Sequence, residues 1–505
     1  MTALTLTAAA IALPLAASVL LLVLWPARLL LEGLLSALPG RLERFLPAPG
    51  RVSRAVAWTG LFGALLPMLP LPVLLVRESG HDAPLLFGID VWLLAVTVAV
   101  VGLCAAVSAW ADEAGRGTWV LVTAVVGVLL LALAARDGVL TLVALDAAGW
   151  LTAVALTLTG RPDTVDALSL RRAVRRWLVV LIGSSWAMWW GLTSDAAWGP
   201  ALLAGGLLAR AGFAGLHTGP AVLLTSLPTP LAMMAGGATM PVAVWLLADT
   251  LGSSTTAGLL GVVGAAVVLL AVPQETALRG VAARWAVAVL TLSAGTACLL
   301  ETGPGRVWGV GGHAAWSPRP AGETSVIDGT KIDAAAGLAG EPTGLAGEPG
   351  GLAGEPAGLV VAAAAVAVAM AVYVAGAVQR AAGHDELSRL GGLAARVPGL
   401  FGWSVAGVML LSGTFPFATA LGRWLLAMST EAAWPLTTLL AVAGWLLLTA
   451  ALTTVHRVFL GLPRMGTEPP EPEPLELAGR ERLVLLLLAA AGTFPLLAPL
   501  TLFRG

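Results

Sequence analysis

ALLAGGLLARAGFAGLHTGPAVLL, residues 201–224, places an arginine, Arg210, inside an apolar segment that is long enough to cross a membrane. A second stretch, MLLSGTFPFATALGRWLLAMS at 409–429, does the same with Arg423. Gly and Pro interrupt both segments, although lipid would otherwise force a spanning helix to be continuous. An ionised group at that depth is costly, so each arginine is expected to face a partner or a water-filled cavity.

The composition is that of a membrane protein. Of the 505 residues 58% are apolar and 11% charged, the net charge is −1, and the mean hydropathy is +0.89. These values lie far outside the range of soluble domains. Because a hydrocarbon core of roughly 30 Å takes about 20 apolar residues per helix, we predict an all-α protein with about fourteen transmembrane helices. They are expected at approximately 3–25, 54–76, 86–110, 117–135, 138–159, 177–194, 199–224, 229–249, 256–272, 282–301, 358–379, 399–428, 433–455 and 483–503.

The distribution of basic residues supports this count, since cytoplasmic loops retain Lys and Arg. With the N-terminus outside, 20 of the 28 basic residues fall in cytoplasmic loops and 6 outside; the other two are Arg210 and Arg423. We therefore expect a multi-pass protein of the inner (plasma) membrane with both termini outside. Met1 to Trp25 lacks a basic leader and a clear cleavage site, so it is interpreted as a retained helix.

Two low-complexity segments interrupt the helices. LAGEP occurs three times on a seven-residue period between Leu338 and Pro356, within an outer loop at 302–357. The acidic TEPPEPEPLE segment, Thr467 to Glu476, is the second. Their Gly and Pro content predicts flexible linkers. Cys104 and Cys298 match no metal-ligand spacing and are expected to be packing residues.

Several motifs resemble one known family. Arg210-Ala-Gly-Phe-Ala-Gly-Leu-His-Thr-Gly-Pro followed by Pro228-Thr-Pro resembles the K-S-A-Q-x-P-L-H and P-T-P block of the proton-translocating membrane subunits of NADH-quinone oxidoreductase and of Mrp-type cation/proton antiporters. Further resemblances follow in the family's order: Phe87-Gly-Ile-Asp90, Leu145-Asp146-Ala-Ala-Gly-Trp-Leu-Thr, Gly391-Gly-Leu-Ala-Ala-Arg-Val-Pro398 and Ser412-Gly-Thr-Phe-Pro-Phe-Ala418.

The resemblance implies a domain plan. The fold would contain inverted five-helix repeats with discontinuous helices 7 and 12. Residues 1–116 would form the N-terminal helices 1–3, 117–250 the first repeat, 256–460 the second repeat with the loop at 302–357, and 461–505 the acidic linker and last helix. Other membrane subunits of a multi-subunit complex would be its partners, beside the lipid bilayer, and no nucleic acid.

The departures from the family concern its proton relay of Lys, His and Glu. Asp146 keeps an acid at the glutamate position, but both broken-helix lysines are arginines, Arg210 and Arg423. An arginine is effectively never deprotonated in proteins and cannot relay a proton. The family's histidine falls on Gly236 and the lysine of its eleventh helix on Val368, so the resemblance implies a degraded relay.

The ion-pathway candidates each have a structural alternative. Asp146 and Arg210 form either a gating pair for proton entry or a structural ion pair. Asp90 is either a half-channel acid or a loop-edge residue, and His217 either a proton donor or a histidine bonded to backbone. Arg423 is the remaining candidate.

Function follows the same resemblance. We expect a membrane subunit of a proton- or cation-translocating complex that is not catalytic alone. It would bind no flavin, nicotinamide, iron–sulfur cluster or metal, because no segment of the sequence has the residues for one. The alternatives are a non-conducting structural or partner-docking subunit, and the membrane half of a two-component inorganic-carbon or cation uptake system.

Overall fold

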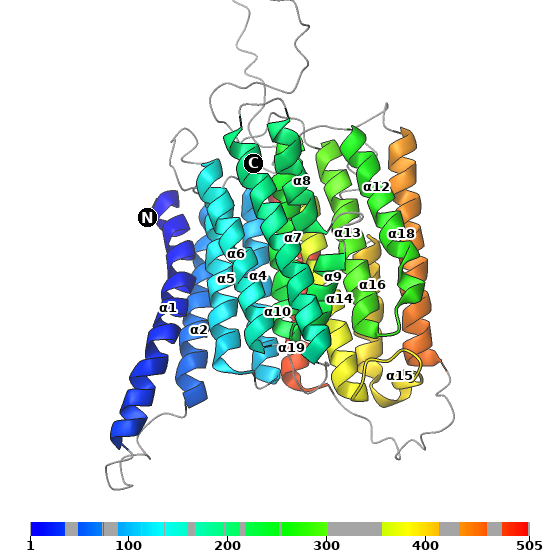
Figure 1. Ribbon diagram of the computed structural model, residues 1–505. Coiled ribbons are helices and arrows are strands. Elements are labelled where there is room, and N and C mark those ends of the chain that lie inside the picture. Colours follow the sequence, from blue (N-terminus) through cyan, green and yellow to red (C-terminus); the bar gives the residue numbers. More distant parts are fainter. Residues whose placement is uncertain are drawn as a thin grey trace, which may run out of the picture.

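The computed structural model describes residues 2–35, 49–72, 74, 89–112, 114–135, 137–159, 167–194, 198–212, 218–251, 255–300, 356–413, 434–461 and 477–502 (Figure 1). Every regular element within these ranges is a helix. The one β-type contact among them is an isolated bridge between Ala277 and Glu386. The predicted all-α class is therefore confirmed for the described part of the chain.

The N-terminal helices are α1 (Ala3–Leu35), α2 (Pro49–Leu65) and α4 (Ile89–Ala111). Small residues let α1 and α2 approach closely, as is common between membrane helices. A Cβ built on Gly60 would lie 2.5 Å from Cβ of Ala17. The Trp92 indole of α4 donates to the carbonyl of Met68, 2.7 Å away, after α2.

The next helices surround the candidate residues. They are α5 (Arg116–Ala134), α6 (Gly138–Thr159), α7 (Ala167–Thr193), α8 (Gly199–Ala211), α9 (Thr218–Ser226), α10 (Thr229–Met234) and α11 (Met240–Leu251). A π-helical turn, Ala235–Thr239, joins α10 to α11. Such turns widen a helix by one residue and occur frequently at functional sites.

The second part of the chain contains α12 (Thr255–Leu270), α13 (Leu278–Leu300), α14 (Pro356–Ala382), the short α15 (Leu393–Arg396), α16 (Pro398–Ser412), α18 (Trp434–Val455) and α19 (Gly479–Leu502). A second π-helical turn, His456–Leu460, follows α18. Pro356, the last residue of the LAGEP repeats, is the first residue of α14.

Within the described ranges, eight helical segments are long and apolar enough to cross a membrane, which makes this a multi-pass membrane protein. They are Ala3–Leu24, Val91–Trp110, Gly117–Ala134, Gly138–Leu158, Thr229–Leu251, Leu278–Leu300, Ala357–Ala382 and Thr438–Leu460. Shorter apolar helices occur at Val52–Met68, Gly258–Gln274 and Pro398–Ser412. The count of fourteen spans and the inverted repeats stay predictions.

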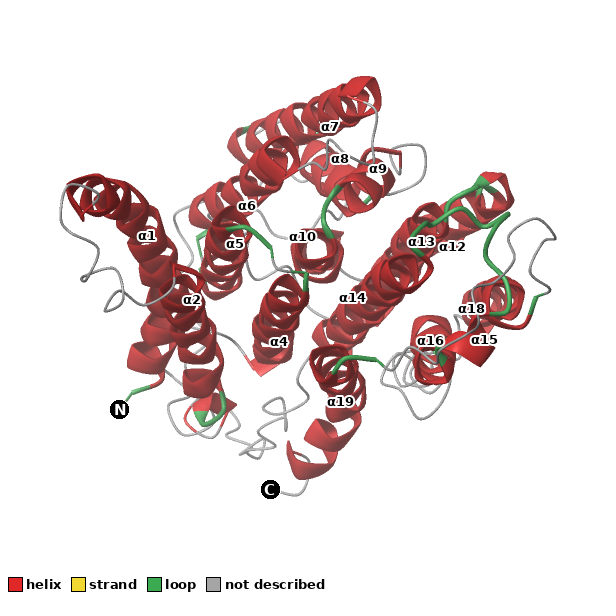
Figure 2. Cartoon of the chain, turned by 90° about the horizontal axis from the view of Figure 1, so that it is seen from below, coloured by secondary structure: helices red, strands yellow, loops and turns green. Residues whose placement is uncertain are grey.

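The burial of these segments separates interior from periphery. All residues of 229–249 are buried. In the most apolar 18-residue window, 94% of the residues are buried for Val91–Trp110, against 33% for Thr438–Leu460. Viewed from below, α4, α10 and α14 lie inside the bundle, with α1 at one edge and α18 towards another (Figure 2). The α10–α11 segment is therefore the centre around which the other helices pack.

Charged residues tie the C-terminal helix to distant parts of the chain. Arg380 of α14 pairs with Asp112, which follows α4, and with Glu481 of α19, both at 3.1 Å. Next to Glu481, the Arg480 guanidinium lies 4.0 Å from the centroid of the Trp110 ring. The end of α4, the end of α14 and the start of α19 therefore meet at one end of the bundle.

Candidate functional site: a buried ion pair beside a helix break

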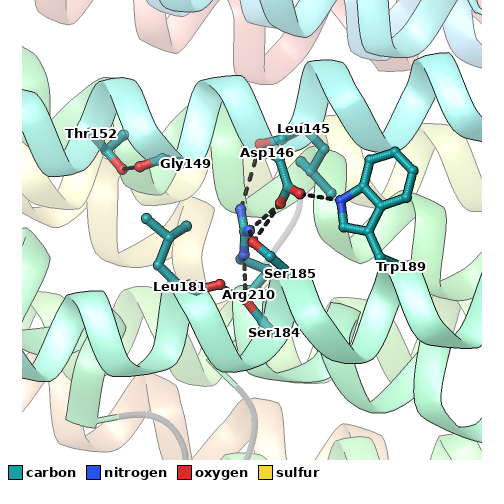
Figure 3. Close-up of polar contacts among 9 residues, drawn as sticks. All are labelled: Leu145, Asp146, Gly149, Thr152, Leu181, Ser184, Ser185, Trp189 and Arg210. Atoms are coloured by element: carbon teal, nitrogen blue, oxygen red, sulfur yellow. Dashed lines mark hydrogen bonds and ion pairs between the residues drawn. The ribbon is translucent and has the colours of Figure 1, made fainter.

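Three consecutive helices bring together the polar residues of the site (Figure 3). Asp146 comes from α6, Ser184, Ser185 and Trp189 from α7, and Arg210 from α8. Arg210 is 3% exposed, so its charge is removed from solvent. The prediction that it would face a partner is correct.

The Arg210 guanidinium forms an ion pair with Asp146 through Nη2 and Oδ1. The same Nη2 donates to Ser185 Oγ at 2.6 Å, and Nε donates to Ser184 Oγ. Nη1 has only a long contact of 3.5 Å to the carbonyl of Leu145. Most of the guanidinium donors are therefore used, and Nη1 keeps spare capacity.

The Asp146 carboxylate has further donors on α7. Trp189 Nε1 donates to Oδ2 at 2.7 Å, and the Ser185 hydroxyl donates to Oδ1 at 2.8 Å. A buried ion pair is close to neutral for stability only when its remaining lone pairs and protons are bonded. The carboxylate meets this condition and the guanidinium meets it except at Nη1, so the geometry favours a firmly held pair with one donor to spare.

Glycines create the space for this arrangement. A Cβ on Gly149, one turn after Asp146, would overlap Nη1 of Arg210. A Cβ on Gly206 would lie 2.5 Å from Cγ of Met188, and one on Gly191 would lie 2.5 Å from the backbone nitrogen of Leu203. The close approach of α7 and α8 thus depends on positions without side chains.

The helix break lies directly after the arginine. Gly212 adopts φ +85°, a left-handed conformation that glycine takes without strain, and it ends α8. Arg210 is therefore in the last turn, where the negative end of the helix dipole favours a cation. α8 ends at Ala211, and the next helix that the structure describes, α9, begins at Thr218, while the discontinuity of helix 7 stays a prediction.

Arg210 also lines a small cavity of about 10 Å³. Polar contributions to its lining come from Arg210, Thr152, Trp177 and Thr239. Thr239 is the last residue of the π-helical turn, so the cavity connects the ion pair with the centre of the bundle.

Next to the cavity, the glycines of the π-helical turn meet apolar groups. A Cβ on Gly236 would lie 2.9 Å from Cγ1 of Val368 and 3.0 Å from Cδ2 of Leu224, and one on Gly237 would lie 2.7 Å from Cβ of Ala369. The π-helical turn is thus packed closely against α14. Gly236 and Val368, which align with the family's histidine and lysine, contact each other.

The other predicted residues have different outcomes. Asp90 lies in the first turn of α4, but its side chain is outside the described part of the structure. His217 and Arg423 lie outside the described residues altogether, so these candidates stay predictions. α16 ends at Ser412 before Gly413, which has φ +68°. Among the described residues there is no group of three or more His, Cys, Asp or Glu that could hold a metal.

Sequence reasoning missed the α7 contribution. Ser184, Ser185 and Trp189 contact residues that are 26, 39 and 43 positions away, respectively. The signal that the sequence offered was a pair of adjacent serines in the spanning part of α7. The local sequence does not indicate that these serines face Asp146 and Arg210.

The comparisons with known proteins place the fold. No protein-family model and no curated protein sequence matches this chain. Among solved structures, a chain of respiratory complex I from Thermus thermophilus with bound NADH is 18% identical, with a TM-score of 0.65, and the match covers 99% of this chain and 97% of that one. A chain of the Mrp complex from Dietzia sp. DQ12-45-1b is 17% identical, with a TM-score of 0.66 and coverage of 98% and 95%.

A third similar structure is the membrane-bound sulfane sulfur reductase, an archaeal respiratory membrane complex. Its matching chain is 14% identical, with a TM-score of 0.67, and the match covers 96% of this chain and 75% of that one. These similarities define the class of protein by its fold. Over nearly its whole length, this chain folds like the matching chains of respiratory and Mrp complexes. The resemblance found in the motifs is confirmed at the level of fold.

Proposed function

We propose that this chain is a membrane subunit of a multi-subunit complex of the proton- or cation-translocating kind, and that its own proton relay is interrupted. The observation that carries the proposal is the Asp146–Arg210 pair beside the break between α8 and α9, in a fold shared with respiratory and Mrp complexes. The chain would lie in the plasma membrane with both termini outside.

The interruption is argued from the groups that lie between the ion pair and α14. A proton path needs side chains that both take up and release protons, or ordered water between them. Arg210 does not release its proton, and the next contact towards α14, Gly236 with Val368, has no polar side chain. The Asp146 carboxylate is occupied by Arg210, Ser185 and Trp189.

The apolar contact between Gly236 and Val368 also favours a second candidate function, a structural or partner-docking subunit that conducts no protons or cations. Both candidate functions assume that the chain belongs to a multi-subunit complex. Co-purification in mild detergent tests this assumption, because other membrane subunits should remain bound to the chain. Recovery of the chain alone, well folded and with no bound subunit, would contradict membership of a complex.

Conduction is tested in proteoliposomes with a potassium gradient, valinomycin and a fluorescent pH indicator inside. We expect the rate of internal pH change to equal that of protein-free vesicles, while an added protonophore collapses the gradient in both. Rapid proton entry that Asp146→Asn abolishes, with the variant still folded, would show that the relay is intact and Asp146 is part of it.

A further inference from the structure

The cavity beside Arg210 contains an unused hydrogen-bond donor. Trp177 of α7 is 3% exposed and lines the cavity, and its Nε1 hydrogen is donated to no described residue. Leaving such a buried group unbonded is unfavourable, because it loses the hydrogen bond that it makes with water in the unfolded chain. Arg210 also lines this cavity, and among the described residues its Nη1 has one long contact, 3.5 Å to the carbonyl of Leu145.

Two threonines, Thr152 and Thr239, line the same cavity. The Thr152 hydroxyl uses its hydrogen on the carbonyl of Gly149 at 2.6 Å, and the Thr239 hydroxyl uses its hydrogen on the carbonyl of Met234 at 3.3 Å. Both oxygens keep lone pairs that can accept. Trp177 and Arg210 therefore offer donors, while Thr152 and Thr239 offer acceptors, around one small space.

The size and charge of the space decide what it holds. A buried water needs about 10–15 Å³ and two to four polar partners, and the cavity has about 10 Å³. Any larger molecule is excluded. The charge of Arg210 is already matched by Asp146, so an ion would gain nothing there, whereas a neutral molecule with two donors and two acceptors matches all four groups.

We propose that this cavity is a binding site for a single water molecule, which accepts hydrogen bonds from Trp177 Nε1 and Arg210 Nη1 and donates to the hydroxyl oxygens of Thr152 and Thr239. The water joins α6, α7, α8 and the π-helical turn. It extends the polar network of the ion pair by one step and ends it at Thr239. The inference does not depend on the proposed transport role.

A double-mutant cycle on Thr152 and Thr239 tests the shared water. Thr→Val removes each hydroxyl with little change of shape. Thermal unfolding of the full chain in detergent can be followed with a thiol-reactive dye, because Cys104 and Cys298 are buried thiols outside any disulfide. Groups that share one partner lose stability non-additively. We expect the Tm loss of the double variant to be smaller than the sum of the single losses by roughly 1–3 °C.

The matched control pairs Thr239→Val with Thr291→Val. Thr291 of α13 is buried, donates to the carbonyl of Val287 at 2.6 Å and does not line this cavity. This second pair should be additive. A cryo-EM map with resolved waters should also show a peak at hydrogen-bond distance, about 2.7–3.2 Å, from Trp177 Nε1.

Two results would overturn the water site. One is additivity of the Thr152 and Thr239 losses. The other is a map that resolves waters elsewhere in the bundle and none beside Trp177. Neither result depends on proton flux, so failure of the water site is distinguishable from failure of the proposed function.

Discussion

Gly236 and Val368 contact each other in the buried interior: a Cβ added to Gly236 would lie 2.9 Å from Cγ1 of Val368. These two positions align with the relay histidine and lysine of the family that the motifs resemble. The proposed interruption of the relay rests on this alignment, and the π-helical turn approaches α14 too closely at Gly236 to leave space for a side chain there. A histidine introduced at 236 alone would collide with α14.

We expect Gly236→Ala to lower the unfolding temperature, because added volume in a close-packed interior costs about 1–3 kcal/mol. Val368→Ala removes the atom that the new methyl group would meet. The double variant, Gly236→Ala with Val368→Ala, should therefore lose less unfolding temperature than the sum of the losses of the two single variants. Thermal unfolding measures both. Strict additivity would mean that the two residues are not in contact.

Asp146→Asn should destabilise the protein by about 3–5 kcal/mol, since it leaves the buried charge of Arg210 without its partner. Replacing both, as Asp146→Asn with Arg210→Gln, removes the uncompensated charge and should recover part of the loss. The measurement is the yield of folded protein and its Tm in detergent. A single variant as stable as the parent would show that the pair is not buried as described.

Gly149→Ala places a methyl group against the Arg210 guanidinium and should lower stability by about 1–3 kcal/mol. Gly183→Ala on α7 is the matched control, because a Cβ there meets nothing within 4 Å. Its effect should be neutral or stabilising by up to about 1 kcal/mol, since alanine favours helices. Equal effects of the two changes on Tm would argue against steric contact at Arg210.

The topology is predicted to place the arginine-rich segment 161–176 in the cytoplasm and the LAGEP loop outside. Single cysteines at Ser169 and Thr343, in a chain with Cys104 and Cys298 replaced by alanine, can be labelled with an impermeant maleimide in intact cells. Only the cysteine at 343 should react, while both react after permeabilisation. Labelling at 169 in intact cells would reject the fourteen-helix arrangement.

Deleting residues 338–354, which stops before α14, should leave membrane insertion and complex assembly intact. A repeat rich in Gly and Pro offers no packed surface, and halving or doubling a flexible loop changes the free energy by only about 0.6 kcal/mol. Quantitative blotting of membranes and native gels measure the outcome. Loss of the complex with the chain still inserted would identify the repeat as a docking element.

Local features of the sequence were sufficient for the class and for the end of α8. Long apolar segments become helices in lipid because each backbone donor and acceptor must be bonded within the segment. Gly212 after Arg210 marks where α8 ends, since a glycine adopts the left-handed conformation without strain. Those requirements involve neighbouring residues, so they are visible in one stretch of sequence.

Tertiary structure alone decided what Arg210 contacts. Its partners Asp146, Ser184 and Ser185 are 64, 26 and 25 residues away along the chain. Gly149 makes room for its guanidinium, and the cavity that reaches Thr239 forms only when four helices pack together. Pairings over such separations depend on how each helix is rotated and how closely it approaches its neighbours. The sequence of an apolar helix constrains this rotation weakly, because any face of the helix can be exposed to lipid. The local composition of the sequence thus determines the class of the protein, whereas the candidate site forms only where α6, α7 and α8 meet.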